Sequence, residues 1–460
     1  MGDVAAARTL ARFVIGLSLD DVPAAAVSSA SLLALDTLGN ALAAVPEDFG
    51  QAALRAAERL GGPAESTLIG RAARVAAANA ALANGTLAHG LDFDDTREDA
   101  IVHTGSVAVP AALAVGEAVG ASGRRVLEAI VSAVEVMCRI GLAVPGRFHA
   151  RHFHPTALTG AFAAAAAAGR LRGLDEDALV QAFGIAGSQA GGLIEYLTAG
   201  TWTKRLHPGW AAHAGIAAVT LAECGMRGPE TVFEGPHGFY QAFAGGHDEA
   251  RLRALLGTLG TTWEVTNLTF KPYPCGSIAH PYMDCALRLR ERHRLVPERI
   301  VAVRCRTAEG PVPRLWEPLA AKQAPPNGYA AKFSLPYLIA TMLVRGRAGL
   351  AEFTDAAVRD ADVLRVAARV SYEIDPTIEY PRRFVGDVRV QLAGDEEYVE
   401  RQEHSRGGPE HPVTGEEVEA KFRGNAGRVL DAGRVEDLVQ RVRRLAEEPS
   451  VRELARSLAP

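Results

Sequence analysis

The feature that most constrains the fold is the helical spacing of small apolar residues through roughly the first 260 residues, where alanine dominates. Segments of this kind alternate with loops that contain glycine or proline. We expect helices over Ala24–Ala43, Ala72–Leu91, Arg125–Ala143, Thr156–Arg170 and Asp175–Ser188. Because small side chains let helices approach closely, this part of the chain is predicted to form a compact all-helical body.

The pattern changes beyond Lys271. Residues 300–305, 370–374 and 385–392 are rich in β-branched residues or alternate like strands, and helical patterns over 331–344 and 362–368 lie between them. Strands and helices mixed without a regular βαβ rhythm indicate an α+β unit. The sequence therefore predicts a mostly α protein. We expect a large helical domain over 1–268 and 411–460, a smaller α+β lid domain over 269–410, and a cleft between them.

Composition excludes several classes of protein. The 460 residues carry a formal net charge of -5, so no basic excess exists for a nucleic-acid surface. Five scattered cysteines lack the spacing of a zinc site and suit a reducing cytoplasm. Met1–Val4 has no basic region before an apolar run, and the apolar stretch 156–169 is shorter than the roughly 20 residues of a membrane span. We expect a soluble, cytoplasmic protein without nucleic-acid or membrane partners.

The first candidate cluster is Asn84–Thr96, followed by His103. If the segment is helical throughout, His89, Asp92 and Thr96 share one face. A polar stripe on an apolar helix is costly to bury unless it is paired or used, so Asp92 and His103 are interpreted as functional. The remaining acidic residues are interpreted as a solvated loop: Asp94, Asp95, Glu98 and Asp99.

That acidic run also loosely resembles the Asp-rich Mg²⁺ motif of isoprenoid synthases, which are all-helical too. Those enzymes need a second metal motif and an aromatic-lined pocket. The sequence has no second motif, and aromatic residues make up only 6% of it. The sequence therefore favours no metal.

The second cluster holds His149, His152 and His154. An extended segment would place His152 and His154 on one side, but two ligands without a carboxylate make a poor metal site. His154 precedes Pro155 and a helix start, which makes it the better candidate for contacting substrate. The other two histidines are interpreted as surface residues.

The third cluster combines Lys204, Arg205 and His207 within Gly200–Trp210. Clustered cations in an acidic protein form an anion-binding patch. Solvated charges at a helix end explain the residues equally well.

The fourth cluster is Lys271–Pro281, where two prolines stiffen the chain ahead of His280. His280 lies near a predicted helix start, at the hinge between the two predicted domains. A hinge is a usual place for a ligand cleft, so His280 is a candidate site residue.

Three of these segments, AHGLDFDDT (88–96), TKRLHPGWAA (203–212) and KPYPCGSIAH (271–280), are similar to those of the MmgE/PrpD family. This family includes 2-methylcitrate dehydratases, cis-aconitate decarboxylases and an iminodisuccinate epimerase. The resemblance implies a helical domain with a lid, a homodimer, and no metal or organic cofactor. The family's active-site residues fall on Asp92, Thr96, His103, His154, Lys204 and His280, and a lid tyrosine falls on Tyr337.

The resemblance implies a cofactor-independent lyase that makes or quenches a carbanion beside a carboxylate. Asp92, His103, Lys204 and His280 would be catalytic. The residues expected to bind a small di- or tricarboxylate are Thr96, His154, Arg205, His207 and Tyr337. A 2-methylcitrate dehydratase is the main prediction; a cis-aconitate decarboxylase or an iminodisuccinate-type epimerase is the alternative. A non-catalytic binding protein is the alternative of another class.

One departure from the family pattern bears on the reaction. Many members have His-Pro-Ser after the acidic loop, where this chain has His103-Thr104-Gly105-Ser106. The change lies where substrate is expected to bind.

Overall fold

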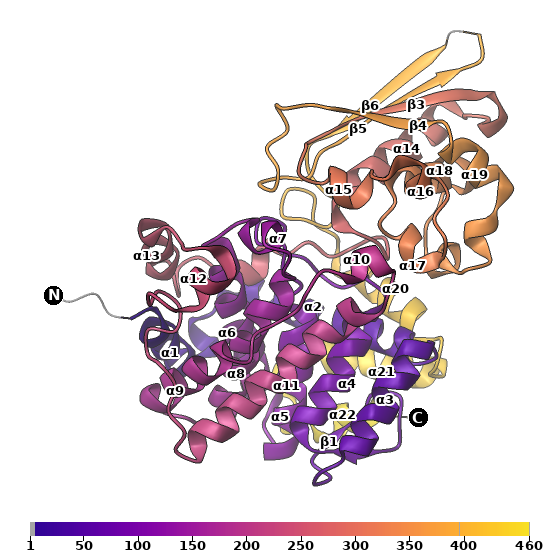
Figure 1. Cartoon of the computed structure of the whole chain (residues 1–460). Helices are drawn as coiled ribbons and strands as arrows, with labels where there is room; N and C mark the ends of the chain where they lie inside the picture. The colour runs from indigo at the N-terminus through magenta and orange to yellow at the C-terminus, as the bar shows by residue number, and fades with distance from the viewer. Residues whose placement is uncertain (1–4, 395, 460) are drawn as a thin grey trace. The chain divides into compact units, whose positions relative to one another are not determined.

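Two units make up the part of the chain that the structure, a computed structural model, describes: residues 5–394 and 396–459 (Figure 1). Unit 1 contains the residues up to Tyr196, Thr201–Leu268 and the residues from Thr414 onward. Unit 2 contains Leu197–Gly200 and Thr269–Val413. The predicted mostly α class is confirmed. Met1–Val4, used above to argue against a signal peptide, lies outside the described residues.

Unit 1 is a body of helices, and all five expected helices are present in it. Its longer helices are α1 (Ala6–Gly16), α2 (Ala24–Ala44), α3 (Asp48–Leu60), α4 (Ala77–Gly90), α5 (Gly105–Val119), α6 (Gly123–Leu142), α8 (Pro155–Arg172), α9 (Glu176–Gly187), α11 (Thr203–Glu223), α20 (Gly415–Ala426) and α21 (Ala432–Arg443). Short helices α7 (Arg147–Ala150), α12 (Phe239–Ala244), α13 (Glu249–Gly257) and α22 (Arg452–Ser457) and the hairpin β1 (Ser66–Thr67) and β2 (Arg74–Val75) complete it. Helix α10 (Tyr196–Ala199) lies where the chain passes between units.

Small residues bring the central helices α4, α8 and α11 together, as the alanine content predicts. Helix α8 buries sixteen of its eighteen residues. Gly209 of α11 crosses α4 so closely that a methyl group there would collide with the carbonyl oxygen of Leu82. Only glycine fits at this crossing.

Helix α2 is long and apolar enough to cross a membrane, the one such helix among the described residues. Its most apolar window is 67% buried within the protein. Burial of this extent is typical of a core helix.

Unit 2 contains a four-stranded sheet in the order β4-β3-β5-β6, covered by α14 (His280–His293) and α18 (Leu335–Arg345). Strand β3 (Ile300–Thr307) pairs parallel with β4 (Val370–Ile374) and antiparallel with β5 (Gly386–Leu392), which pairs antiparallel with β6 (Glu397–Gln402). Short helices α15 (Val312–Leu315), α16 (Leu319–Gln323) and α17 (Gly328–Ala331), with α19 (Ala361–Ala367), complete the unit. The three expected strands are confirmed.

Strand β6 was not expected from the sequence. Its residues alternate between exposed and half-buried, and three of its six side chains are charged. Such a pattern is ordinary for the edge of a sheet, where apolar alternation is weak.

Candidate functional site

The turn after α4 carries the first site residues. The condition that residues 84–96 are helical throughout is not met, because α4 ends at Gly90, near the predicted end at Leu91, and Asp92 adopts a left-handed backbone conformation with φ 56°. Asparagine and aspartate tolerate this region better than most residues. The turn keeps Asp92 next to His89, whose carbonyl oxygen accepts from the Asp92 N–H at 2.9 Å. The stripe expected on a helix face is instead assembled by a loop.

The acidic loop is buried at its centre, so the interpretation of Asp94 and Asp95 as solvated is wrong. Both are 0% exposed, whereas Glu98 and Asp99 are half-buried. The Oδ2 of Asp94 lies 2.7 Å from Nδ1 of His89. The Asp95 carboxyl accepts from the backbone N–H groups of Thr104 at 3.0 Å and Gly105 at 2.7 Å. It thereby binds the N-terminus of α5, where the orphan donors of a helix favour a carboxylate.

Burial and the neighbouring Asp94 raise the pKa of Asp95 to about 7, against the hydrogen bonds it accepts. Both effects disfavour the charged form of a carboxyl group. Asp95 therefore fixes the loop to α5 mainly by hydrogen bonds and carries a proton readily near neutral pH.

His103 is held at one ring nitrogen, which determines what the other can do. Its Nδ1 lies 2.7 Å from the carbonyl oxygen of Asp95 and 3.1 Å from Oγ1 of Thr96. A carbonyl oxygen only accepts, so Nδ1 carries the proton and a neutral His103 presents a lone pair at Nε2. The backbone N–H of His103 donates to Thr156 Oγ1 at 3.1 Å, which joins the loop to α8.

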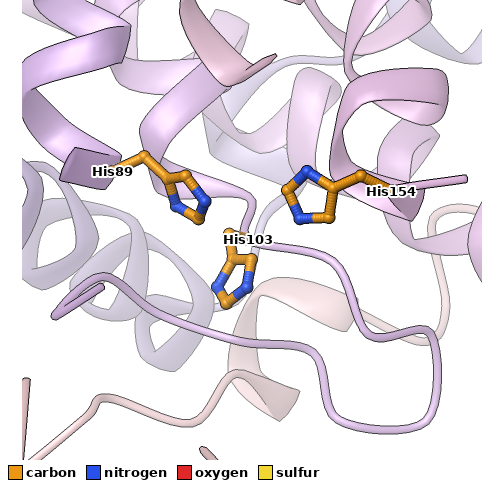
Figure 2. A group of neighbouring side chains, drawn as sticks. All are labelled: His89, His103 and His154. Atoms are coloured by element: carbon orange, nitrogen blue, oxygen red, sulfur yellow. The ribbon is translucent and has the colours of Figure 1, made fainter. Parts of the chain in front are cut away.

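Three histidines from separate segments meet in unit 1: His89 at the end of α4, His103 before α5 and His154 at the start of α8 (Figure 2). Their ring centroids lie 4.8 Å (His89–His103), 5.6 Å (His89–His154) and 6.1 Å (His103–His154) apart. All three are buried. One ring nitrogen from each lies within 4.8 Å of the others, which is an arrangement able to hold a metal ion.

His207 of α11 extends this cluster. Its Nδ1 lies 3.1 Å from Nδ1 of His154, and the ring of Tyr196 packs edge-on against both. Burial, and then neighbouring histidines and Lys204, lower the pKa of His207 to about 3 and that of His154 well below its usual value. Burial also lowers the pKa of His89. At neutral pH these rings are uncharged, and they act by hydrogen bonds and lone pairs.

Lys204 supplies the buried cation beside the cluster. Its Nζ donates to Oδ1 of Asp92 at 3.0 Å, and the two side chains are 7% and 2% exposed. Arg205 lies elsewhere on α11, with its guanidinium 4.1 Å from the ring centroid of Phe49. Unit 1 therefore brings six of the predicted residues into one neighbourhood: Asp92, Thr96, His103, His154, Lys204 and His207. Arg205 instead stacks on Phe49.

The other predicted site residues belong to unit 2. His280 is the first residue of α14, fully buried, with Nε2 3.4 Å from the carbonyl oxygen of Cys275 and its ring against Tyr273. The Tyr337 hydroxyl donates to the carbonyl oxygen of Glu352 at 3.1 Å within the unit's core. Their roles toward substrate stay predictions.

Two histidines lie outside the cluster. His149 is half-buried, and the exposed His152 has φ 65° after the short helix α7. The segment is not extended, so the alternation assumed for His152 and His154 does not apply.

The sequence reasoning missed His89, Asp94, Asp95 and Tyr196 as members of the site. His89 was visible in the segment AHGLDFDDT, where its position three residues before Asp92 was a usable signal. Tyr196 gave no signal, because it precedes an unremarkable loop and meets the histidines only through the packing of α8 and α11.

Comparison with known proteins matches both parts of the chain. The model of the MmgE/PrpD N-terminal domain matches residues 8–251, and that of the MmgE/PrpD C-terminal domain matches residues 273–446. A cis-aconitate decarboxylase-like protein oryM of Aspergillus oryzae is 27% identical, covering 97% of this chain and 95% of its own. Cis-aconitate decarboxylases of Aspergillus terreus and Homo sapiens are 27% and 26% identical, each covering 95% of this chain and 93% and 91% of their own.

Proposed function

Since these matches span most of its length, the protein belongs to the MmgE/PrpD family, and we propose that it is a lyase of the cis-aconitate decarboxylase type. The relatives described above are named as decarboxylases, which favours the carboxy-lyase alternative over the 2-methylcitrate dehydratase that the sequence favoured. The proposed substrate is a small unsaturated tricarboxylate.

The observation that carries the proposal is the pairing of one buried cation with a histidine of fixed tautomer. Lys204 is held by Asp92, and a substrate carboxylate placed beside its Nζ gains a charge-assisted hydrogen bond in a poorly solvated place. His103, whose Nδ1 faces the Asp95 carbonyl oxygen, lies in the same cluster of buried histidines. The neutral His154 and His207 add hydrogen-bond partners without adding charge.

In the proposed reaction, one carbon–carbon bond breaks and one bond between carbon and a proton forms. The bond between the carboxylate carbon and the adjacent carbon breaks, CO₂ leaves, and the electron pair stays on carbon, stabilised by conjugation with a remaining carboxylate next to Lys204. A doubly protonated His103 then donates from Nε2 to that carbon and regains a proton from water. The Asp95 carbonyl oxygen, which accepts from Nδ1, stabilises the charged ring before transfer.

The test is turnover of a set of polycarboxylates, followed by proton NMR in deuterated buffer. Cis-aconitate should lose CO₂, and the product should gain one deuterium at the protonated carbon. 2-Methylcitrate, citrate and iminodisuccinate serve as matched substrates. Dehydration of 2-methylcitrate with no turnover of cis-aconitate would instead make the protein a hydro-lyase, and no turnover of any would make it a binding protein.

His103→Ala tests the proton donor. We expect kcat to fall by about 10²–10⁴-fold with a much smaller change in KM, because His103 acts on the reacting carbon rather than on binding. His237→Ala, at an exposed histidine of the same unit, should leave both constants unchanged. An unchanged kcat in His103→Ala would remove His103 from the chemistry. His280→Ala measures in the same assay whether unit 2 contributes a residue.

A further inference from the structure

His89, His103 and His154 share a feature that the proposed reaction does not use: the Nδ1 of each ring faces a neighbour. His89 Nδ1 lies 2.7 Å from the Asp94 carboxylate, His103 Nδ1 lies 2.7 Å from the Asp95 carbonyl oxygen, and His154 Nδ1 lies 3.1 Å from His207. Because Nδ1 of each ring makes these contacts, we take Nε2 as the atom through which each ring would bind a ligand.

Two of these atoms have a defined electronic state in the neutral rings. Nδ1 of His89 and of His103 must donate, because each faces an oxygen that accepts, so both Nε2 atoms carry lone pairs. His89 Nε2 is fully buried and has no hydrogen-bond partner among the described residues. A buried lone pair such as that of His89 Nε2 needs a donor or a cation beside it.

We propose that His89, His103 and His154 bind a divalent transition-metal ion such as Zn²⁺ through Nε2, and that this ion reversibly blocks the site. Tetrahedral zinc with Zn–N bonds of about 2.1 Å needs ligand nitrogens about 3.4 Å apart. One ring nitrogen of each histidine lies within 4.8 Å of the others, so small ring movements bring three ligand nitrogens to that spacing.

The surroundings also match those of metal-ligating histidines. A ligating imidazole usually donates its other N–H to a carboxylate or a backbone carbonyl, as His89 does to Asp94 and His103 to Asp95. The buried carboxylate of Asp94 offsets the charge of the ion. Three protein ligands leave the fourth position open for water or for a substrate carboxylate.

The His154–His207 pair determines which ligand the site accepts. If His154 donates to His207, its Nε2 carries a lone pair and completes the metal site. If His207 donates to His154, the Nε2 of His154 carries a proton and donates to an anion. The position of one proton therefore decides whether the site binds a cation or an anion. Metal and tricarboxylate cannot bind at the same time.

The test is titration of the full-length, metal-free protein with Co²⁺ in the absence of substrate. We expect one equivalent to bind with the strong visible absorption of tetrahedral Co²⁺, and Zn²⁺ to displace it, as the usual order of affinities requires. His89→Ala and His154→Ala should abolish the signal. His237→Ala and Cys224→Ser, which remove an exposed histidine and the exposed thiol, should leave it unchanged.

Asp94→Asn is the second variant, which guards against a loss of signal through misfolding. It keeps the shape of the side chain and should weaken Co²⁺ binding by about 10–100-fold with an unchanged circular dichroism spectrum. A weak octahedral spectrum, or binding that survives in His89→Ala, would overturn the proposal.

The inhibition, unlike the binding, rests on the proposed function. Zn²⁺ should suppress turnover of cis-aconitate, and EDTA should restore it. Full activity with the zinc site saturated would disprove the block. A protein that binds Co²⁺ as described but turns over no polycarboxylate would retain the metal site and lose the proposed function.

Discussion

The two units differ in where their ion pairs lie. Unit 1 buries ionisable side chains in pairs: Lys204 with Asp92, His89 with Asp94, and Arg139 with Glu135. Unit 2 has an apolar core that includes Val303, Val388 and Trp316, and ion pairs such as Arg306–Glu373 lie at its surface. Small-residue helices pack too closely to admit much water, so the polar groups between them must satisfy one another. The buried ion pairs of the candidate site therefore lie in unit 1, and unit 2 also buries ionisable side chains, among them Lys271 and His280.

The largest difference between the units should appear when a buried charge loses its partner. Lys204→Met leaves Asp92 buried without its cation, which should lower the free energy of unfolding by about 3–5 kcal/mol and strongly reduce turnover. Arg306→Met, which breaks an exposed pair in unit 2, should change stability far less, because solvent screens the pair. Urea unfolding of both variants measures the contrast, and equal losses would show that burial is not the cause.

Close helix packing in unit 1 gives the next effect. Gly209→Ala places a methyl group against the Leu82 carbonyl oxygen and should destabilise the protein by about 1–3 kcal/mol. Gly424→Ala in α20, where nothing lies within 4 Å, should stabilise it by about 0.5–1 kcal/mol. Thermal unfolding reports both signs. A harmless Gly209→Ala would mean that α4 and α11 separate easily.

The buried histidines should make unit 1 sensitive to acid. The pKa of His207 is about 3 in the folded protein and about 6.5 in the unfolded chain, so between these values the unfolded state binds more protons. Stability is therefore lost as pH falls from about 6.5 toward 3. His207→Gln should flatten the curve of unfolding free energy against pH in this window, and an unchanged slope would place the acid sensitivity elsewhere.

A small effect is expected in the core of unit 2. Tyr337→Phe removes a hydroxyl that donates to the Glu352 carbonyl oxygen and should cost about 0.5–1.5 kcal/mol of stability, with KM unchanged. The sequence predicts a substrate contact for Tyr337, which would instead raise KM. Steady-state kinetics on the polycarboxylate substrate separates the two roles.

The sequence predicted the helices and strands in which apolar residues recur at a regular spacing. The alanine-rich periodicity located α2, α6, α8 and α9, and β-branched runs located β3, β4 and β5, because burial on one face imposes a period. Strand β6 escaped because its charged residues line a sheet edge. The start of α4 was placed five residues too early, at Ala72 instead of Ala77, because Arg74 and Val75 form strand β2.

The site was predictable in its residue types and not in its geometry. Asp92, His103 and Lys204 were named from their segments, but the burial of Asp94 and Asp95 was not. The burial of these residues follows from their partners, since the Asp95 carboxyl binds the start of α5. Local pattern cannot show this, since one left-handed residue, Asp92, redirects the chain after α4.

The C-terminal helix α20 has a consequence for how the protein is made. Lys421 Nζ lies 2.7 Å from Oδ1 of Asp36, donates to the carbonyl oxygen of Phe93 and lies 3.8 Å from that ring's centroid. Burial raises the pKa of Asp36, and this lysine opposes the shift. A ribosome must therefore translate the message through Lys421 before this lysine can hold the segment between α4 and α5. A transcript cut short ahead of that codon yields a chain whose loop after α4 lacks this lysine contact, although all three histidines of the cluster are present.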